Sequence, residues 1–403
     1  MRPFEGVRVL DFSRIVSGPY CTQMLGFLGA EIIKIEDREK GDSVRTGAGV
    51  EELKQRGLAS AFLMFNAGKK SMTLDLKKPE TRDIITKLAA TSDVVVENFR
   101  PGVIQRLGFD YQSLRKINPR LIYCSVSGYG QTGPDAGVAA FDGNIQAMSG
   151  MMGMSGEPQG PPMRAGYTVA DTATGLNAAV AISAALYQRD RLPREQQRGQ
   201  YIDVAMLDCG ISLTSQLAGP LLTGGIKPRR RANLSINYEP TADVYNTADG
   251  AMQLAIMREN HVQIFFKLMG VAHLNTDARG STREARVANS AYIRGLVQAE
   301  FMKAGTVEWK RRLDEAKLPC APVLELHEAI EQPQVKHRGL VRETPEPETG
   351  ITMRTFNAPF QYEHDGPEPS FPPQRLGAQN EELLGSLGYT REQIEQFRKN
   401  KII

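Results

Sequence analysis

The stretch VRVLDFSRIVSGPYCTQMLGFLGAEIIKIE, residues 7–36, decides the fold class. An apolar run at 7–12 is followed by a helical pattern at 19–29 and then by a second apolar run at 32–35. This alternation is typical of βαβ units, in which parallel strands are joined by crossover helices. The stretch therefore predicts an α/β domain built on a parallel sheet.

The same alternation continues beyond residue 36. A helical pattern at 79–90 precedes an apolar run at 94–96, and further strands are predicted at 120–127 and 201–206. A Gly-rich and Met-rich passage, residues 128–166, lies between these last two strands. A loop of this length is usually functional or mobile, so we expect it to contribute to a site. A helix rich in small residues then follows from Asp171 to about Arg189.

A second domain is predicted after Gly224, where the pattern changes. Two short strands flank Asp249-Gly250, which is hairpin turn chemistry, and helices are expected at 263–269, 285–304 and 307–316. The last seventy residues contain Pro-rich strands and a closing helix with a capping box from Thr390 to Gln393. The basic run KPRRR at 227–231 is interpreted as an exposed linker.

Composition excludes several classes of protein. The 49 Lys and Arg residues against 46 Asp and Glu give a net charge of +3, so neither a nucleic acid nor a membrane is expected as partner. The longest small and apolar stretch, 175–187, is shorter than the ~20 residues that span a bilayer, and no signal segment is recognised, so a cytoplasmic protein is predicted. No metal site is expected, because the cysteines and histidines are scattered: Cys21, Cys124, Cys209, Cys320, His261, His273, His327, His337 and His364.

The motif GYGQTG at 128–133 matches the GxGxxG pattern of dinucleotide-binding folds. Pro134 follows it, and residues 135–140 have no helical period, so no helix N-terminus is predicted to receive a pyrophosphate. We interpret the motif as a tight-turn loop, with a nicotinamide site as the alternative.

Asp171 lies between an apolar approach and a helix, which predicts a helix N-cap. The positive end of the helix would also keep its carboxylate ionised for use as a nucleophile, and the pattern alone leaves both roles open. Arg100 and Arg106 flank a Pro-Gly turn after an apolar strand, where anionic ligands bind in open α/β sheets. A ligand-binding role and a surface role stay equally open for these two arginines.

Six segments together resemble the class III CoA-transferase family, also called the carnitine and bile-acid CoA-transferase family, which includes formyl-CoA transferase. Besides residues 7–36, they are GKKSMTLDLK (68–77), VVVENFRPGVIQRLGF (94–109), SVSGYGQTGP (125–134), GYTVADTATG (166–175) and the tail NEELLGSLGYTREQI (380–394). They occur in the order of the family and span nearly the whole chain.

The resemblance implies a Rossmann-like large domain built from both chain termini, a smaller α+β domain between two linkers, and a homodimer of interlocked subunits. With the boundaries indicated above, we expect the N-terminal part of the large, CoA-binding domain at 1–200 and a linker at 201–225. The small domain is expected at 226–330, and a return linker with the C-terminal part of the large domain at 331–403.

The resemblance also implies the site. Asp171 in VADTATG matches the nucleophilic aspartate of the family, and Asp142 in AFDGN matches a further active-site position of formyl-type members. The CoA thioester is a substrate, and neither a tightly bound cofactor nor a metal is required. The implied CoA-binding positions are Val16, Ser17, Arg38, Leu74, Lys77, Asn98, Phe99, Arg100 and Arg106.

The implied reaction moves CoA from an acyl-CoA to a carboxylic acid through an aspartyl anhydride and an aspartyl-CoA thioester. Formyl and oxalate members have Gln, Lys and Tyr where this chain has Val16, Ala139 and Phe141, and they have a tetraglycine loop that is missing here. These changes remove polar groups, so oxalate is disfavoured. A dicarboxylate such as succinate or glutarate is the acceptor we expect.

Three other functions each agree with part of the sequence. An α-methylacyl-CoA racemase shares the fold and the aspartate, but it needs a histidine base before the loop aspartate, where this chain has Phe141. An NAD-dependent dehydrogenase would bind a nicotinamide cofactor at the glycine motif. A catalytically silent CoA-binding protein would be unaffected by Asp171→Ala.

Overall fold

A computed structural model describes all residues, 1–403, and the chain divides into two compact units. The first unit contains residues 1–151, 164–225 and 333–403, and the second contains residues 152–163 and 226–332. Each unit has a hydrophobic core of its own. They are described separately below.

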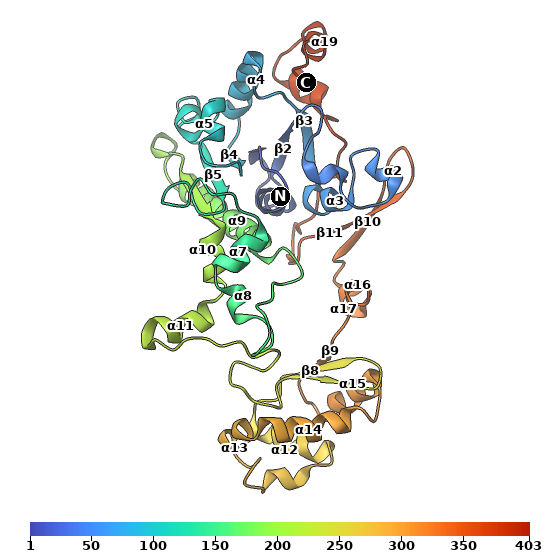
Figure 1. The fold of residues 1–403 in the computed structure, drawn as a ribbon. Helices are drawn as coiled ribbons and strands as arrows, with labels where there is room; N and C mark the ends of the chain where they lie inside the picture. Colours follow the sequence, from blue (N-terminus) through green and yellow to red (C-terminus); the bar gives the residue numbers. More distant parts are fainter. The chain divides into compact units, whose positions relative to one another are not determined.

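A six-stranded sheet forms the centre of the first unit (Figure 1). Its order is β3-β2-β1-β4-β5-β6, and every neighbouring pair is parallel. This order is that of the doubly wound dinucleotide-binding fold, with the topological switch point between β1 and β4. The predicted parallel α/β sheet is confirmed. Its strands are β1 (Arg8–Asp11), β2 (Glu31–Glu36), β3 (Lys69–Thr73), β4 (Val94–Glu97), β5 (Ile122–Ser127) and β6 (Tyr201–Ala205).

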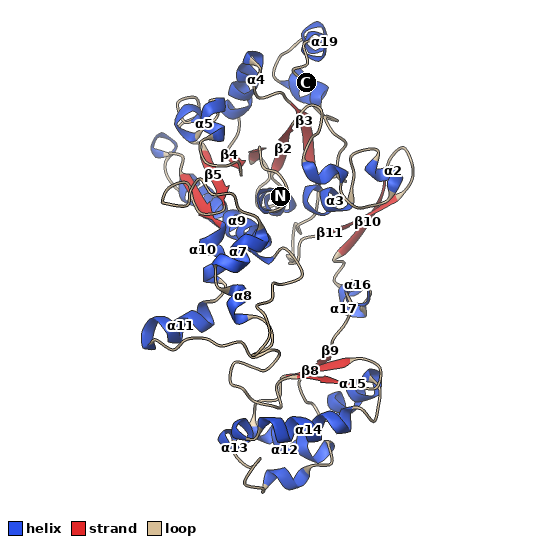
Figure 2. Ribbon diagram, in the orientation of Figure 1, coloured by secondary structure: helices blue, strands red, loops and turns tan.

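Helices cover both faces of this sheet (Figure 2). Alternate side chains of each strand point to opposite faces, so the strands contribute to two separate cores. The helices of the first unit are α1 (Ser17–Phe27), α2 (Glu51–Lys54), α3 (Ser60–Asn66), α4 (Pro79–Ala90), α5 (Val103–Leu107), α6 (Tyr111–Leu114), α7 (Asp142–Met148), α9 (Val169–Asp190), α10 (Met206–Ser212), α11 (Ser215–Gly224), α17 (Pro333–His337), α18 (Asn380–Ser386) and α19 (Arg391–Lys399). Helix α8 (Met151–Met154) lies where the chain passes to the second unit.

One core lies between the sheet and helices α4, α5, α18 and α19. The C-terminal segment contributes Leu384, Ile394 and Ile402 to it, each 5% exposed or less. The expected capping box begins α19, because Thr390 Oγ1 accepts from the amide of Gln393 and Gln393 Oε1 accepts from the amide of Thr390. The chain reaches this region through the antiparallel strands β10 (Val341–Pro345) and β11 (Thr352–Phe356).

The other core lies between the sheet and helices α1, α9 and α10. Helix α9 has the length and apolar composition of a membrane span, but Ala178, Ile182 and Leu186 on one of its faces are buried in this core. Packing against the sheet accounts for the apolar residues of that face. The opposite face exposes Leu176, Val180 and Tyr187.

The second unit is α+β. Strands β7 (Val244–Asn246), β8 (Ala251–Leu254) and β9 (Cys320–Pro322) form an antiparallel sheet, and the expected hairpin joins β7 to β8. Trp309, the single tryptophan of the chain, is fully buried in its core. Arg230 ties residues 152–163 to this unit by donating to the carbonyls of Glu157 and Gly160. The helices are α12 (Glu259–Leu268), α13 (Arg283–Ala288), α14 (Ser290–Phe301), α15 (Thr306–Glu315) and α16 (Leu326–Ile330).

Residues 201–225, where we expected a linker, form β6, α10 and α11 and lie in the first unit. Strand β6 pairs with β5 at the edge of the main sheet, from Tyr123↔Tyr201 to Ser127↔Ala205. The expected helix at 285–304 is interrupted at Asn289, which separates α13 from α14.

Candidate active site

Asp171 is positioned by the close packing of α9 against α1. A Cβ atom on Gly175 would lie 2.6 Å from the carbonyl oxygen of Ser17 and 3.2 Å from the amide of Cys21, so only glycine allows this approach. Asp171 lies one turn before Gly175 and therefore beside the start of α1. There the hydroxyl of Ser17 is close enough to its carboxyl to favour the ionised form.

Asp171 is not the N-cap of its helix, so this prediction was wrong. Helix α9 begins two residues earlier, at Val169, and Thr168 at the cap position makes no side-chain hydrogen bond to the first turn. Asp142, the first residue of α7, supplies the acceptor instead. Its Oδ2 accepts from the amides of Ala170 and Asp171 at 2.8 and 3.1 Å. A carboxylate from another helix thus satisfies two of the unpaired amides of α9.

The pKa of the Asp171 carboxyl is raised to about 6, mainly by burial and also by the nearby Asp142 carboxylate, while the Ser17 hydroxyl opposes both effects. At neutral pH most of the Asp171 population is still ionised. A carboxylate with a raised pKa is more basic than an exposed aspartate. The site therefore favours a reactive carboxylate near pH 7.

A cavity of about 220 Å³ opens in front of Asp171 at the carboxyl ends of β1, β4, β5 and β6. It includes the switch point between β1 and β4, where ligands bind in folds of this kind. Ile15 and Ser17 follow β1, Asn98–Pro101 follow β4, Val126–Gly128 end β5, and Met206 follows β6. Residues Ala136 and Val138–Phe141 of the glycine-rich loop complete the wall.

Several predicted site residues meet at this cavity. Ser17, Asn98, Phe99, Arg100 and Asp171 line it, and Asp142 adjoins it through the first turn of α9. The side chain of Asn98 is already engaged, because its Oδ1 accepts from the amide of Arg14 and its Nδ2 donates to the Arg14 carbonyl, both at 2.8 Å. Asn98 therefore shapes the loop after β1 as well as the cavity.

The remaining predicted CoA-binding residues lie elsewhere at the same edge of the sheet. Leu74, directly after β3, is 1% exposed and packs in the core, so only its backbone can meet a ligand. Val16 is buried. The charged side chains are exposed or partly exposed: Arg38 pairs with Glu39, Lys77 follows β3, and Arg106 lies on α5 with its guanidinium beside Gly102.

The sequence predicted a contribution from the glycine-rich loop, including Ala139 and Phe141, but it gave no indication of Ile15 or Met206 as cavity residues. Gly128 at the end of β5 explains how the loop closes the cavity. A Cβ atom at this position would lie 2.2 Å from that of Ala140, so only glycine lets the loop fold back onto β5. Ile15 and Met206 each follow a predicted strand. This position indicates a cavity residue only when the strand order is known, because the order decides which strand ends lie beside the cavity. The glycine motif at 128–133 precedes no helix before α7, as interpreted from the sequence.

The cavity combines one carboxylate, Asp171, and one cation, Arg100, with small polar and apolar side chains. No histidine lines it, and the chain contains no group of three or more His, Cys, Asp or Glu side chains arranged to hold a metal ion. Three of the four cysteines are buried, and all four are free thiols.

A doubly wound parallel sheet with a partly buried aspartate beside a cavity at its switch point has the layout of an α/β protein that binds its ligand at the carboxyl ends of the strands. The model of CoA-transferase family III matches residues 4–380, and the chain belongs to this family. It is thus a family III CoA-transferase, as the sequence resemblance predicted.

Relatives of known activity agree. The chain is 35% identical to the succinate–glutarate CoA-transferase of Agrobacterium fabrum, over 96% of each chain, and 33% identical to the succinyl-CoA:glutarate CoA-transferase of Mus musculus, over 100% of this chain and 91% of that one. The crystal structure of a CAIB/BAIF family protein from Brucella suis is similar with a TM-score of 0.86 and 32% identity, over 96% of this chain and 99% of that chain.

Proposed function

We propose that Asp171 is the nucleophile of the transfer. It first binds the acyl group of the donor as an anhydride and then binds CoA as a thioester, from which CoA passes to the acceptor acid. The observation that supports this most strongly is its geometry: a carboxylate with a pKa near 6 at the wall of a cavity, oriented by Ser17 and by the first turn of α9. It is the one Asp or Glu whose side chain lines this cavity.

The reaction has two halves. Asp171 attacks the thioester carbonyl, the C–S bond breaks, and an aspartyl anhydride and CoA thiolate form. The thiolate then attacks the Asp171 carbonyl, which releases the donor acid as a carboxylate and leaves an aspartyl-CoA thioester. The acceptor carboxylate repeats the sequence in reverse: it displaces the thiolate to give a second anhydride, and the thiolate takes the acceptor acyl group and frees Asp171. This route predicts ping-pong kinetics.

The developing negative charge on the attacked carbonyl oxygen requires hydrogen-bond donors. The amides of Ala170 and Asp171 at the start of α9 are not free for this role, because both donate to Asp142 Oδ2. The loop that lines the cavity contains further amides at Ala139 and Ala140. We assign the oxyanion contact to these two amides, which also face the thioester end of the substrate in this proposal.

CoA would extend from this cavity along the carboxyl edge of the sheet. Arg106, Arg38 and Lys77 supply cations for its phosphates, and the turn at 98–100 supplies contacts near the thioester. A charged contact to a buried or partly buried phosphate contributes about 1.5–3 kcal/mol, so Arg106→Ala should weaken CoA binding about tenfold or more. An unchanged dissociation constant would show that CoA lies elsewhere.

The acceptor in this proposal is a dicarboxylate of four or five carbons, such as succinate or glutarate. Two supports are independent of each other: the cavity presents Ala139 and Phe141 at two of the positions where oxalate-type members have polar groups, and the names of the relatives above include glutarate and succinate. Oxalate, whose two carboxylates are bonded directly to each other, should be a poor acceptor.

Two features of the whole protein belong to the same proposal. The exposed apolar residues Leu176, Val180 and Tyr187 on α9 support a homodimer, whose mass in solution can be measured by light scattering. The free, mostly buried thiols support a cytoplasmic location. The two compact units would correspond to the large and small domains of the family, with both termini in the large one.

The experiment is mass spectrometry of the intact protein after incubation with a panel of acyl-CoAs, with and without hydroxylamine, followed by peptide mapping. An adduct of CoA, or a hydroxamate at Asp171, supports the route and identifies the donor. Asp171→Ala should abolish the adduct and leave CoA affinity within about tenfold. No adduct, combined with exchange of the α-proton into deuterated solvent, would contradict the route and favour a racemase.

A further inference from the structure

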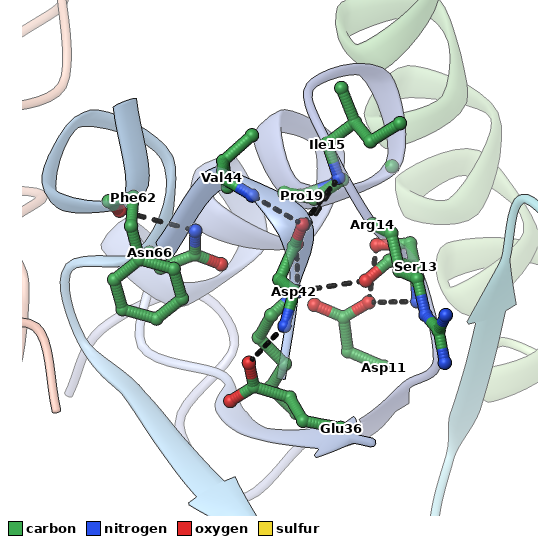
Figure 3. Close-up of polar contacts among 12 residues, drawn as sticks. Asp11, Ser13, Arg14, Ile15, Pro19, Glu36, Asp42, Val44, Phe62 and Asn66 are labelled. Carbon is green, nitrogen blue, oxygen red and sulfur yellow. Dashed lines mark hydrogen bonds and ion pairs between the residues drawn. The ribbon is translucent and has the colours of Figure 1, made fainter. Parts of the chain in front are cut away.

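A buried ion network lies behind the cavity, among residues of β1, β2 and β3 and of the segment that follows β2; Figure 3 shows its three carboxylates, Asp11, Glu36 and Asp42. It joins three carboxylates to three cations, and no member is more than 2% exposed: Asp11, Glu36, Asp42, Lys34, Arg45 and Lys69. None of the six lines the cavity. Moving charges out of water costs free energy, so a stabilising effect alone does not explain why six charged groups are buried here.

The contacts of Asp42 point toward the cavity loop. Its carboxylate accepts from the amide of Ile15 at 3.2 and 3.1 Å, one distance to each oxygen, and it is paired with Lys34 Nζ at 3.0 Å. Lys34 also donates to the carbonyl of Ser13 at 2.8 Å. The same loop is held from the other side by Asn98, through the amide and carbonyl of Arg14.

The loop held in this way has an unfavourable backbone. Ile15 has a φ of +73°, a left-handed conformation that is rare for a β-branched residue and is maintained only by its surroundings. The side chain of Ile15 lines the cavity, and Ser17, two residues later, binds Asp171. The conformation of this one residue thus sets one cavity wall and the approach of the hydroxyl that orients the nucleophile.

We propose that Asp42, paired with Lys34, is a positioning residue that holds Ile15 in its left-handed conformation and so fixes the wall of the cavity beside Asp171. The inference rests on the proposed function of Asp171. An asparagine at position 42 offers a single uncharged acceptor oxygen, for which the amides of Ile15 and Val44 and Lys34 Nζ compete, so the hold on Ile15 weakens and the residue relaxes to negative φ. The Ile15 side chain then leaves the wall, and water reaches the reacting carbonyl.

The test compares four proteins: Asp42→Asn, Ile15→Ala, Ile15→Gly and the double variant Asp42→Asn/Ile15→Gly. For each, the transfer kcat, the donor KM and the fraction of donor hydrolysed instead of transferred are measured. Asp42→Asn should lower kcat about tenfold with little change in donor KM, because it misplaces the groups around Asp171 and leaves the contacts with CoA unchanged. Ile15→Ala should raise the hydrolysed fraction without a loss of melting temperature, since only a cavity wall is shortened.

Glycine adopts positive φ without strain, so Ile15→Gly separates conformation from side chain. It should raise the melting temperature by about 2 °C while it raises hydrolysis. In the double variant, Asp42→Asn should then cause little further loss of kcat, because no strained residue is left to hold.

The matched control is Glu239→Gln, which breaks the buried pair of Glu239 and Arg286 in the second unit at 2.8 Å. It should lower the melting temperature and leave the hydrolysed fraction unchanged. The proposal is overturned if Asp42→Asn behaves like this control, or if its effect is undiminished in the Ile15→Gly background. If Asp42→Asn does not fold, an unchanged hydrolysed fraction in both Ile15 variants overturns it. Failure of wild-type protein to form any Asp171 adduct would instead contradict the proposed function.

Discussion

At the scale of single residues, the raised pKa of Asp171 gives the nucleophile a defined pH dependence. The ionised form attacks, and its pKa is about 6. The rate constant of adduct formation at saturating donor should therefore be constant above pH 7 and fall about tenfold per unit well below pH 6. Ser17→Ala removes a hydrogen bond to the charged form and should move this profile to higher pH. Rapid quench over pH 4.5–8 measures it, and a profile that is flat down to pH 4.5 would contradict the assignment.

The same pKa has a consequence for stability. The native protein binds the Asp171 proton up to about pH 6, whereas the unfolded chain releases it near the ordinary value of 3.8. Between these values the folded state holds more protons, so this contribution to stability is present at low pH and is lost as the pH rises through 6. Asp171→Asn should then stabilise the protein at pH 8 by about 1–3 kcal/mol.

Thermal melts of wild type and Asp171→Asn at pH 8 and pH 4.5 measure this effect. The difference should be large at pH 8 and small at pH 4.5. An equal difference at the two pH values would show that the gain has another origin than ionisation. Asp110→Asn is a control, because Asp110 is a partly buried carboxylate that caps α6 and does not line the cavity in front of Asp171.

At the scale of elements, the packing of α9 on α1 decides where Asp171 lies. Gly175→Ala places a Cβ atom 2.6 Å from the Ser17 carbonyl, so the helices must separate or shift. The substitution should destabilise by about 1–3 kcal/mol although alanine favours helices, and it should slow adduct formation because Ser17 and Asp171 move apart.

Gly295→Ala in the interior of α14 is the matched control, because a Cβ atom there meets nothing within 4 Å and no proline follows it. It should stabilise by up to about 1 kcal/mol through helix propensity alone. Thermal melts and the rate of adduct formation are measured for both variants. A gain of stability in Gly175→Ala equal to that in Gly295→Ala would contradict the close approach of the two helices.

The elements also show what a sequence can reveal. Strands at 7–12, 94–96 and 120–127 were predicted because burial on both faces of a parallel sheet leaves continuous apolar runs. The start of α9 was misplaced because its cap, Asp142, comes from a helix 28 residues earlier, and a capping rule reads only neighbouring residues. The hydrogen bond from the Ile15 amide to Asp42 spans 27 residues and has no local sequence pattern, so it could not be predicted from the sequence.

At the scale of the whole molecule, the two units have separate cores and should unfold separately. Trp309 lies in the core of the second unit, where its ring packs against Phe301 and its Nε1 donates a hydrogen bond to the Phe301 carbonyl. Tryptophan fluorescence therefore reports the second unit alone, whereas far-UV circular dichroism reports both. Leu384→Ala creates a cavity in the core of the first unit, where Leu384 is fully buried, and should cost about 2–5 kcal/mol there.

Thermal unfolding of wild type and Leu384→Ala, followed by both signals, tests this independence. The variant should lower the main dichroism transition and leave the fluorescence transition in place. A CoA thioester, which binds the folded first unit in our proposal, should raise the dichroism transition alone, by an amount set by its concentration relative to its dissociation constant. If both signals move together in either experiment, the units unfold as one cooperative body, and the site at the sheet edge is stabilised by the second unit as well as by its own core.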